Sequence, residues 1–247
     1  MTGRRGPVKR ALLATPLGRP LLTLKRRFDA PEVRRDREDN ELLIQLLGEV
    51  LEPDSHCVEV GAHEGAILAE MVRLAPQGRH IAFEPLPALA LHLRTAFPAV
   101  DVHEAAASDE DGEQEFVHVV TRPGWSGFRQ RPYPGDERLE RITVKTERLD
   151  DVVAHPVALV KIDVEGAELQ VLRGAQRTLQ EHRPVVVFEH GLGSADHYGT
   201  EPRDVFGALA GYEISGLDGD GPYDLDEFER TYLDRERVNF VARPVFR

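Results

Sequence analysis

Apolar residues near the start of the chain recur at the spacing of a helix. Between residues 38 and 51 they occupy every third or fourth position, namely Leu42, Leu43, Leu46, Leu47 and Val50. Side chains at this spacing share one face of a helix. Pro53 and Asp54 follow and are expected to stop it. The pattern therefore predicts an amphipathic helix over residues 38–51.

From residue 56 onward, short runs rich in β-branched residues alternate with helical runs. The strand-like runs cover residues 56–60, 80–83, 100–103, 158–162 and 185–189. The helical runs cover residues 66–74, 87–96, 167–179 and 202–210. Helices of this length between strands are typical of parallel strands in a sheet that is covered on both faces. We therefore expect an α/β fold with a doubly wound, mostly parallel, Rossmann-like sheet.

Two strand-like runs break this alternation because no helix lies between them. Residues 115–120 and 141–145 flank a stretch rich in proline and glycine. This arrangement predicts a hairpin-like insertion near residues 113–147. Its loop carries three aromatic residues, Trp125, Phe128 and Tyr133. These side chains either anchor the loop to the body of the domain or close over a substrate.

The end of the chain carries two further strand-like runs, over residues 212–214 and 237–242. An acidic segment, residues 218–229, joins them. Charged residues prefer solvent, so we expect this segment to be an exposed connector between the last two strands.

The composition is that of an ordinary globular protein. The 247 residues are 41% hydrophobic and 30% charged, which fits a single α/β-sized domain. Cys57 is the one cysteine, which excludes an internal disulfide and a zinc site built from cysteines. No run approaches the roughly 20 apolar residues that cross a bilayer. We therefore expect a soluble, cytoplasmic protein.

Charge is distributed unevenly along the chain. Residues 1–28 carry eight lysines and arginines and no acid, while the whole chain has a net charge of -12, so the remainder carries -20. An acidic body repels phosphate groups, and no nucleic-acid partner is expected. We expect a basic arm over residues 1–37, followed by a single domain over residues 38–247. The arm is either a flexible terminus or a segment that contacts an anionic membrane surface or a partner.

The first strand of the alternation runs into a turn with two glycines. Glu59 lies in the strand, and Gly61, Ala62, His63 and Gly65 follow it. In open parallel sheets, ligands bind beyond the carboxyl ends of the strands. Gly61 lets the backbone turn sharply next to a ligand, and Gly65 lets the helix begin close to it. The alternative is a tight turn that binds no ligand.

Charge indicates which cofactor this turn would bind. His63 stands where a dinucleotide motif has its second glycine, and Glu59 would repel a pyrophosphate. S-adenosylmethionine carries an ammonium and a sulfonium, which a carboxylate attracts. We therefore predict that the strand and the turn bind S-adenosylmethionine through Glu59, Gly61, Ala62, His63 and Gly65.

Acidic residues also follow the second and third strands. Glu84 ends the second strand, where a carboxylate can accept the ribose hydroxyls of an adenosine. Ser108 and Asp109 follow three alanines after the third strand, and Asp109 is expected to accept from the adenine amino group. The alternatives are an acid at a helix N-terminus for Glu84 and an ordinary turn for Asp109. We predict Glu84, Ser108 and Asp109 as further cofactor-binding residues.

Several segments taken together resemble the FkbM family of S-adenosylmethionine-dependent methyltransferases. The matching segments are residues 58–65, 83–85, 106–109, 149–151, 160–168 and 171–175. The sequence VKIDVEGAE over residues 160–168 is the most specific of them. The family commonly has Asn at position 63 and Asp at position 59, where this chain has His63 and Glu59.

The resemblance implies a fold and an activity. Members of the family have a seven-stranded methyltransferase sheet whose last strand is antiparallel. They usually methylate a hydroxyl group of a sugar, a polyketide or a related natural product. The resemblance therefore implies an O-methyltransferase that acts on a small-molecule hydroxyl acceptor, and it leaves open whether the chain forms a homo-oligomer.

A hydroxyl group is a poor nucleophile, so a base or a metal ion must assist its reaction. The candidate side chains follow the strands at residues 158–162 and 185–189, and they are Asp163, Glu165, Glu168, Glu189 and His190. We predict Asp163 and His190 as the catalytic residues. A helix cap for Asp163 and a structural role for His190 are the alternatives.

Metal dependence and the reaction class both remain open. The side chains of Asp163, Glu165, Glu189 and His190 could hold Mg²⁺, although their spacing does not require a metal site. A nicotinamide-dependent oxidoreductase is an alternative function, which His63 and Glu59 disfavour. A non-catalytic adenosine-binding protein is another, because a fold does not fix a function.

Overall fold

The computed structural model describes residues 31–235 and 237–245. The chain divides into two compact units, Met1–Leu42 and Leu43–Arg247. Helix α3 (Pro31–Val50) crosses the boundary between them and begins earlier than its apolar spacing predicts, because its first residues are charged helix formers without an apolar period. Residues 1–30 of the predicted basic arm lie outside the described residues, and its predicted end at residue 37 falls within α3.

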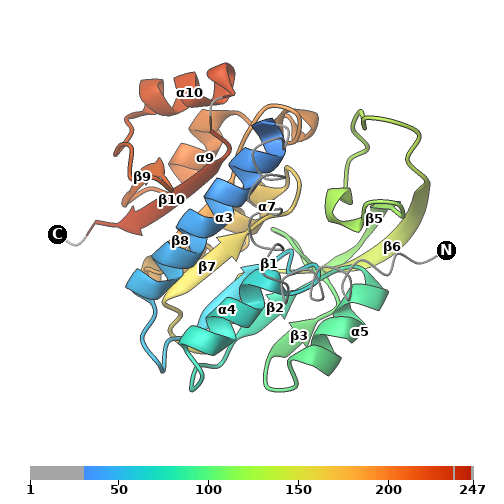
Figure 1. Ribbon diagram of the computed structural model, residues 1–247, viewed down its shortest axis with the longest axis horizontal. Helices are drawn as coiled ribbons and strands as arrows, with labels where there is room; N and C mark the ends of the chain where they lie inside the picture. Colours follow the sequence, from blue (N-terminus) through green and yellow to red (C-terminus); the bar gives the residue numbers. More distant parts are fainter. Residues whose placement is uncertain (1–30, 236, 246–247) are drawn as a thin grey trace, which may run out of the picture. The chain divides into compact units, whose positions relative to one another are not determined.

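Within the described residues, seven strands form the central sheet (Figure 1) in the order β3-β2-β1-β7-β8-β10-β9. These strands are β1 (Cys57–Val60), β2 (Ile81–Phe83), β3 (Asp101–His103), β7 (Leu159–Ile162), β8 (Val185–Glu189), β9 (Tyr212–Gly216) and β10 (Asn239–Pro244). From β3 to β8 the neighbouring strands are parallel, and β10 is antiparallel to both β8 and β9. The predicted α/β fold, mostly parallel with an antiparallel last strand, is confirmed.

Most of the helices between the strands lie where their periodicity predicts them. Helices α4 (Ala66–Leu74) and α5 (Pro87–Ala96) have the predicted bounds. The helix predicted over residues 167–179 is instead two helices, α7 (Glu168–Arg173) and α8 (Gln176–Glu181). Gly174 lies between them, and a Cβ there would lie 1.9 Å from the carbonyl oxygen of Ser108. None of the helices in residues 31–235 and 237–245 is long and apolar enough to span a membrane.

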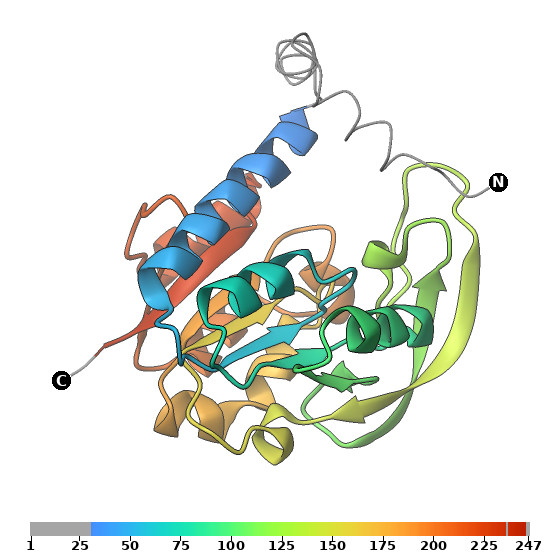
Figure 2. The same cartoon turned by 60° about the horizontal axis from the view of Figure 1, so that its bottom comes forward.

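Helices lie on both faces of the central sheet (Figure 2), and apolar side chains are buried on each face. Residues alternate along each strand, so Ala82 packs with Leu68 of α4 and Leu93 of α5, while Phe83 belongs to the cluster on the opposite face. That second cluster contains Leu172 of α7 and residues of α9 (Pro202–Ala208). Burial on both faces fixes the sheet, and with it the positions of the strand ends.

The insertion forms a smaller sheet of its own. Strands β5 (Gly112–Val119) and β6 (Leu139–Glu147) are antiparallel, and the short β4 (Ala106–Ala107) pairs in parallel with β6. The loop between β5 and β6 contains the 3₁₀ helix η1 (Pro123–Trp125). A short helix, α6 (Leu149–Val152), follows β6 and leads back to the central sheet.

The acidic segment after β9 is the main departure from the predicted elements. It contains helix α10 (Leu225–Asp234), which buries Phe228 and Tyr232. Asp224 caps the helix by accepting a hydrogen bond from the amide of Glu227 at 2.8 Å. Residues 218–222 of the segment are exposed, as expected. The pattern did not predict the helix, in which two aromatic residues four positions apart place one face in the core.

Candidate functional site

A cavity lies where the order of the strands reverses. β1 pairs with β2 on one side and with β7 on the other, so that Val60 stands between Phe83 and Ile162. Ligands of open parallel sheets bind at such a switch point, beyond the carboxyl ends of the strands. The cavity there measures about 220 Å³, and it is lined by residues of the three strand ends and of the insertion, among them Gly61, His63, Glu84, Phe128, Asp163 and Glu165.

The glycine turn forms one wall of this cavity. Gly61 has a φ of 78°, and a Cβ on it would lie 1.9 Å from the carbonyl oxygen of Asp163. Its amide donates to the carbonyl oxygen of Phe83 at 3.0 Å. The turn thus touches the ends of both neighbouring strands, and only a glycine fits there. His63 also adopts a positive φ, of 50°, and lines the cavity.

Glu84 presents a fixed carboxylate at the end of β2. Its side chain is buried, and its two oxygens accept hydrogen bonds from the amides of His63 at 2.8 Å and Leu86 at 2.9 Å. Burial raises the pKa of Glu84, and the two amides oppose this shift. The predicted ribose-binding acid therefore lines the cavity in one defined orientation.

Glu59 lies beneath the cavity rather than in its wall. It is 2% exposed, and its carboxylate lies 3.8 Å from the Nζ atom of Lys161, which in turn lies 3.0 Å from Asp163. One of its oxygens has no hydrogen-bond partner among the described residues. Burial raises the pKa of Glu59 to about 7, and Lys161 opposes the shift. Lys161 thus links Glu59 to Asp163, which lines the cavity.

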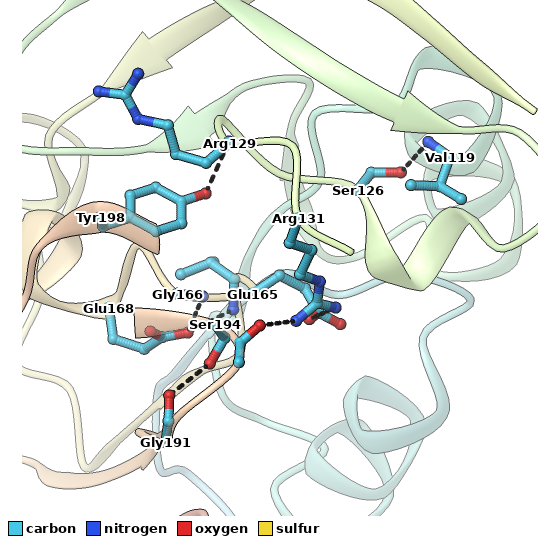
Figure 3. A network of polar contacts seen from close by, with 12 residues as sticks. Val119, Ser126, Arg129, Arg131, Glu165, Gly166, Glu168, Gly191, Ser194 and Tyr198 are labelled. Carbon is cyan, nitrogen blue, oxygen red and sulfur yellow. Dashed lines mark hydrogen bonds and ion pairs between the residues drawn. The ribbon is translucent and has the colours of Figure 1, made fainter. Parts of the chain in front are cut away.

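The turn after β7 brings two carboxylates, those of Asp163 and Glu165, to the cavity. Glu165 forms an ion pair with Arg131 of the insertion (Figure 3). Burial raises the pKa of Glu165 to about 8, and Arg131 opposes this shift. Glu168 is buried below the turn, where one oxygen accepts from the amides of Val164 at 3.2 Å and Gly166 at 3.1 Å. Glu168 therefore holds the turn in shape.

The aromatic residues of the insertion divide into two groups. Phe128 lines the cavity together with Phe116 of β5. Trp125 and Tyr133 instead stack on each other with ring centroids 6.1 Å apart, and the guanidinium of Arg122 lies 4.3 Å from the Trp125 ring. Phe128 thus forms part of the cavity wall, whereas Trp125 and Tyr133 stabilise the loop that carries it.

Some of the predicted cofactor-binding residues do not line this cavity. Ser108 and Asp109 line a separate cavity of about 380 Å³, together with Arg129 and Tyr198. The three alanines before Ser108 do line the first cavity, namely Ala105, Ala106 and Ala107. Ala62 is buried behind the turn. Gly65 lies close to the ring of Phe97, and a Cβ on it would lie 2.6 Å from that ring.

His190, the predicted base, lies in an aromatic stack and not in the cavity wall. It is 1% exposed, with ring centroids 5.6 Å from Phe228 and 4.9 Å from Tyr232. Neither of its ring nitrogens has a hydrogen-bond partner among the described residues. Burial lowers its pKa to about 4. This position corrects the expectation of a catalytic His190, because a neutral ring enclosed by aromatic side chains does not reach the cavity.

The four side chains that could hold Mg²⁺ are not arranged as a metal site. In the part of the chain that the structure describes, no three His, Cys, Asp or Glu side chains are placed to hold a metal ion. Glu165 is paired with Arg131, and His190 is enclosed by aromatic rings. Asp163, Glu165, Glu189 and His190 therefore do not form a metal site in this arrangement.

The sequence pattern did not point to Arg131. It lies on the insertion loop, far along the chain from the acid it pairs with, and loop arginines are common. The loop as a whole could have indicated a functional role for its arginines, since they alternate with aromatic residues near a predicted ligand site.

The chain is similar to known methyltransferases. The family model described as "Methyltransferase FkbM domain" matches residues 59–214. The 2-O-methyltransferase NoeI of Sinorhizobium fredii is 27% identical over 184 residues, which cover 66% of this chain and 75% of NoeI. Methyltransferase 1 of Beauveria bassiana is 28% identical over 148 residues, which cover 49% of this chain and 58% of that protein.

Among solved structures, a methyltransferase FkbM from Methylobacillus flagellatus aligns with a TM-score of 0.49 and 18% sequence identity. The alignment covers 78% of this chain and 44% of that chain, so this chain spans less than half the length of that protein. The family model, in contrast, matches more than half of this chain, over residues 59–214. The chain therefore belongs to the FkbM methyltransferase domain family.

Proposed function

We propose that the protein is an S-adenosylmethionine-dependent methyltransferase that methylates a hydroxyl group on a sugar or another natural-product small molecule. The observation that carries this proposal is the charge of the cavity, whose wall includes the carboxylates of Glu84 and Asp163. Carboxylates attract the sulfonium and the ammonium of this donor and repel a pyrophosphate. The same charge disfavours a nicotinamide dinucleotide.

The residues of the cavity fit the donor in three respects. Each oxygen of Glu84 accepts one backbone amide, which leaves lone pairs that can accept the ribose hydroxyls. The alanines at positions 105–107 leave space for a flat ring. Gly61 brings the backbone of the turn to the cavity wall, where a ligand can contact it. These groups would hold the donor next to the end of β7.

The donor, when bound, supplies an already activated methyl group. The protein therefore has to hold the acceptor oxygen in line with that group, and no covalent enzyme intermediate is needed. Asp163 lines the cavity and is paired with Lys161 at 3.0 Å. We propose that its carboxylate accepts a hydrogen bond from the acceptor hydroxyl and orients it. His190 has no part in this proposal because it lies outside the cavity wall.

The acceptor class is supported by similarity and by the cavity wall. NoeI, which resembles this chain, is named a 2-O-methyltransferase. On the side of the insertion, Phe116 and Phe128 offer apolar ring surfaces to the cavity. Sugar rings and polyketide chains both have apolar faces that pack on aromatic rings. A small, partly apolar molecule with a free hydroxyl therefore fits the proposal.

Mass spectrometry tests the reaction directly. The protein is incubated with S-adenosylmethionine labelled in its methyl group and with a panel of glycosides and polyketides, with and without Mg²⁺ and a chelator. We expect transfer of the label to a hydroxyl oxygen of at least one acceptor. Binding of the donor without transfer to any acceptor class would favour a non-catalytic adenosine-binding protein.

Calorimetry with one pair of variants tests the role of Glu84. Glu84→Gln removes the charge of a buried acid in the cavity, and it should weaken donor binding roughly 10-fold or more, since hydrogen bonds to charged groups contribute about 1.5–3 kcal/mol. Glu104→Gln is the matched control, because Glu104 is exposed and pairs with Arg94. Equal donor affinities of the two variants would argue against a ribose site at Glu84.

A further inference from the structure

The carboxylates of the turn after β7 differ in their surroundings. The side chain of Asp163 is 44% exposed and is paired with Lys161. The side chain of Glu165 is only 16% exposed, yet it lines the same cavity. Glu165 is thus a nearly buried acid with access to the space that the acceptor would occupy.

The backbone fixes the position of Glu165. Its φ is 59°, in the left-handed region that residues other than glycine seldom adopt, and Gly166 follows with a φ of 109°. A Cβ on Gly166 would lie 2.6 Å from the carbonyl oxygen of Ser194. Glu168 accepts hydrogen bonds from the amides on both sides of Glu165. An uncommon backbone conformation held from several sides is typical of a functional position.

The side chain of Glu165 is held by the insertion. Arg131 forms an ion pair with it (Figure 3). Arg131 also donates to the carbonyl oxygen of Gly193 at 3.3 Å. The insertion makes a second contact nearby, where the amide of Arg129 donates to the hydroxyl oxygen of Tyr198 at 3.2 Å. Tyr198 belongs to the 3₁₀ helix η2 (Ala195–Tyr198). Arg131 therefore connects the insertion with the turn after β7 and with the loop after β8, next to the carboxylate of Glu165.

The charges around Glu165 favour a bound proton. Burial, together with the charges of Asp163 and Glu168, raises its pKa to about 8, although Arg131 lowers it. Glu189 and Tyr198 also face this group, and Glu165 contributes to raising the pKa of each of them. A base is most effective when its pKa lies close to the working pH. Arg131 keeps part of the Glu165 population ionised, and therefore able to accept a proton.

We propose that Glu165 is the catalytic base that takes the proton of the acceptor hydroxyl, and that Arg131 is a positioning residue that holds its carboxylate at the cavity wall. The inference rests on the proposed function. As the hydroxyl oxygen bonds to the methyl carbon, the bond from that carbon to sulfur breaks and sulfur keeps the electron pair. The hydroxyl proton passes to a carboxylate oxygen of Glu165, and it is later released to solvent.

Kinetics of matched variants test the base. With any acceptor that the wild-type protein methylates, Glu165→Gln should lower kcat about 10²- to 10⁴-fold, the usual contribution of a general base, while calorimetry gives an unchanged donor affinity. Arg131→Met should move the rise of kcat to higher pH, because the loss of a cation raises the pKa of Glu165. The control Arg141→Met removes a similar ion pair, with Glu115 on the exposed side of the hairpin, and should leave the pH profile unchanged.

A titration of the unliganded protein gives a second readout that needs no acceptor. In protein with ¹³C-labelled glutamate carboxyl groups, we expect a resonance that titrates near pH 8, is missing in Glu165→Gln and moves to higher pH in Arg131→Met. Titration of this resonance in the ordinary range of a glutamate, or near-normal kcat of Glu165→Gln, would overturn the proposal. Failure of the wild-type protein to bind the donor would instead overturn the proposed function, whatever the titration gives.

Discussion

The ends of β7 and β8 form an instructive pair. The two strands are parallel neighbours, with Ile162 opposite Phe188, and each is followed by residues able to exchange protons. The end of β7 faces the cavity with Asp163 and Glu165, whereas the residue after β8, His190, is enclosed by aromatic rings. A place at the carboxyl end of a parallel strand is therefore not enough to make a residue part of the site.

The difference arises from what packs over each strand end. β7 lies at the switch point next to the glycine turn, where the two halves of the sheet diverge and leave a space. β8 pairs on its other side with the antiparallel β10. Helix α10 covers that side with Phe228 and Tyr232, and His190 packs against both rings.

The largest effect is expected for Gly61→Ala, which alters the contact between the glycine turn and the end of β7. The new Cβ would lie 1.9 Å from a backbone oxygen of Asp163, and the φ of 78° disfavours alanine as well. We expect a loss of more than about 4 kcal/mol of stability in urea unfolding, or loss of the folded state. Gly48→Ala is the control, because Gly48 lies in a helix with open space around it. Equal stability of the two variants would contradict the close approach.

The second largest effect is expected in the pH dependence of the free energy of unfolding, to which His190 at the end of β8 contributes. Burial lowers the pKa of His190 from 6.5 to about 4. Between these two pH values, the unfolded chain therefore binds a proton at His190 that the folded protein does not bind. The wild-type protein should lose about 3 kcal/mol of stability from this group between pH 6.5 and 4. In His190→Phe this loss should be absent. Parallel stability curves for both proteins over this range would show that His190 is not buried in its neutral form.

A smaller change is expected for Asp163→Asn at the end of β7. The variant keeps the shape of the side chain but loses its charge and its ion pair with Lys161. We expect methyl transfer to fall about 100-fold, as for a misplaced acceptor group, with donor binding retained in calorimetry. Turnover close to that of the wild-type protein would remove Asp163 from the proposed role.

The smallest change in methyl transfer is expected for His190→Phe. The ring would stay within the stack formed with Phe228 and Tyr232, and the cavity wall would be untouched. We expect turnover under the conditions used for Asp163→Asn to equal that of the wild-type protein. A marked loss in a variant with normal thermal stability would return His190 to the list of catalytic candidates.

The sequence was sufficient for the parts of the site that depend on local pattern. Gly61 follows a buried strand, and Glu84 ends the next one, so that each is fixed by the strand before it. Parallel strands bring their carboxyl ends to one edge of the sheet, which places both residues at the cavity. The central sheet was predictable for the same reason, since each strand and most helices have a clear apolar period.

The parts that the sequence missed depend on contacts between distant segments. Arg131 meets Glu165 only because the insertion folds back over the turn after β7. His190 is enclosed because Phe228 comes from a helix whose acidic residues conceal its apolar face. The residues near positions 131 and 190 in the sequence do not predict the contacts with Glu165 and Phe228, since the packing of the whole domain determines them.

Hydrogen exchange in the presence of S-adenosylmethionine tests the central claim, that the carboxylate-lined cavity at the end of β1 and β7 binds the methyl donor. We expect slower exchange of backbone amides in residues 60–65, 83–86 and 105–107, and no change in β10 beside His190. Unchanged exchange in all of these segments, or protection that centres on β8 and β10, would contradict the account.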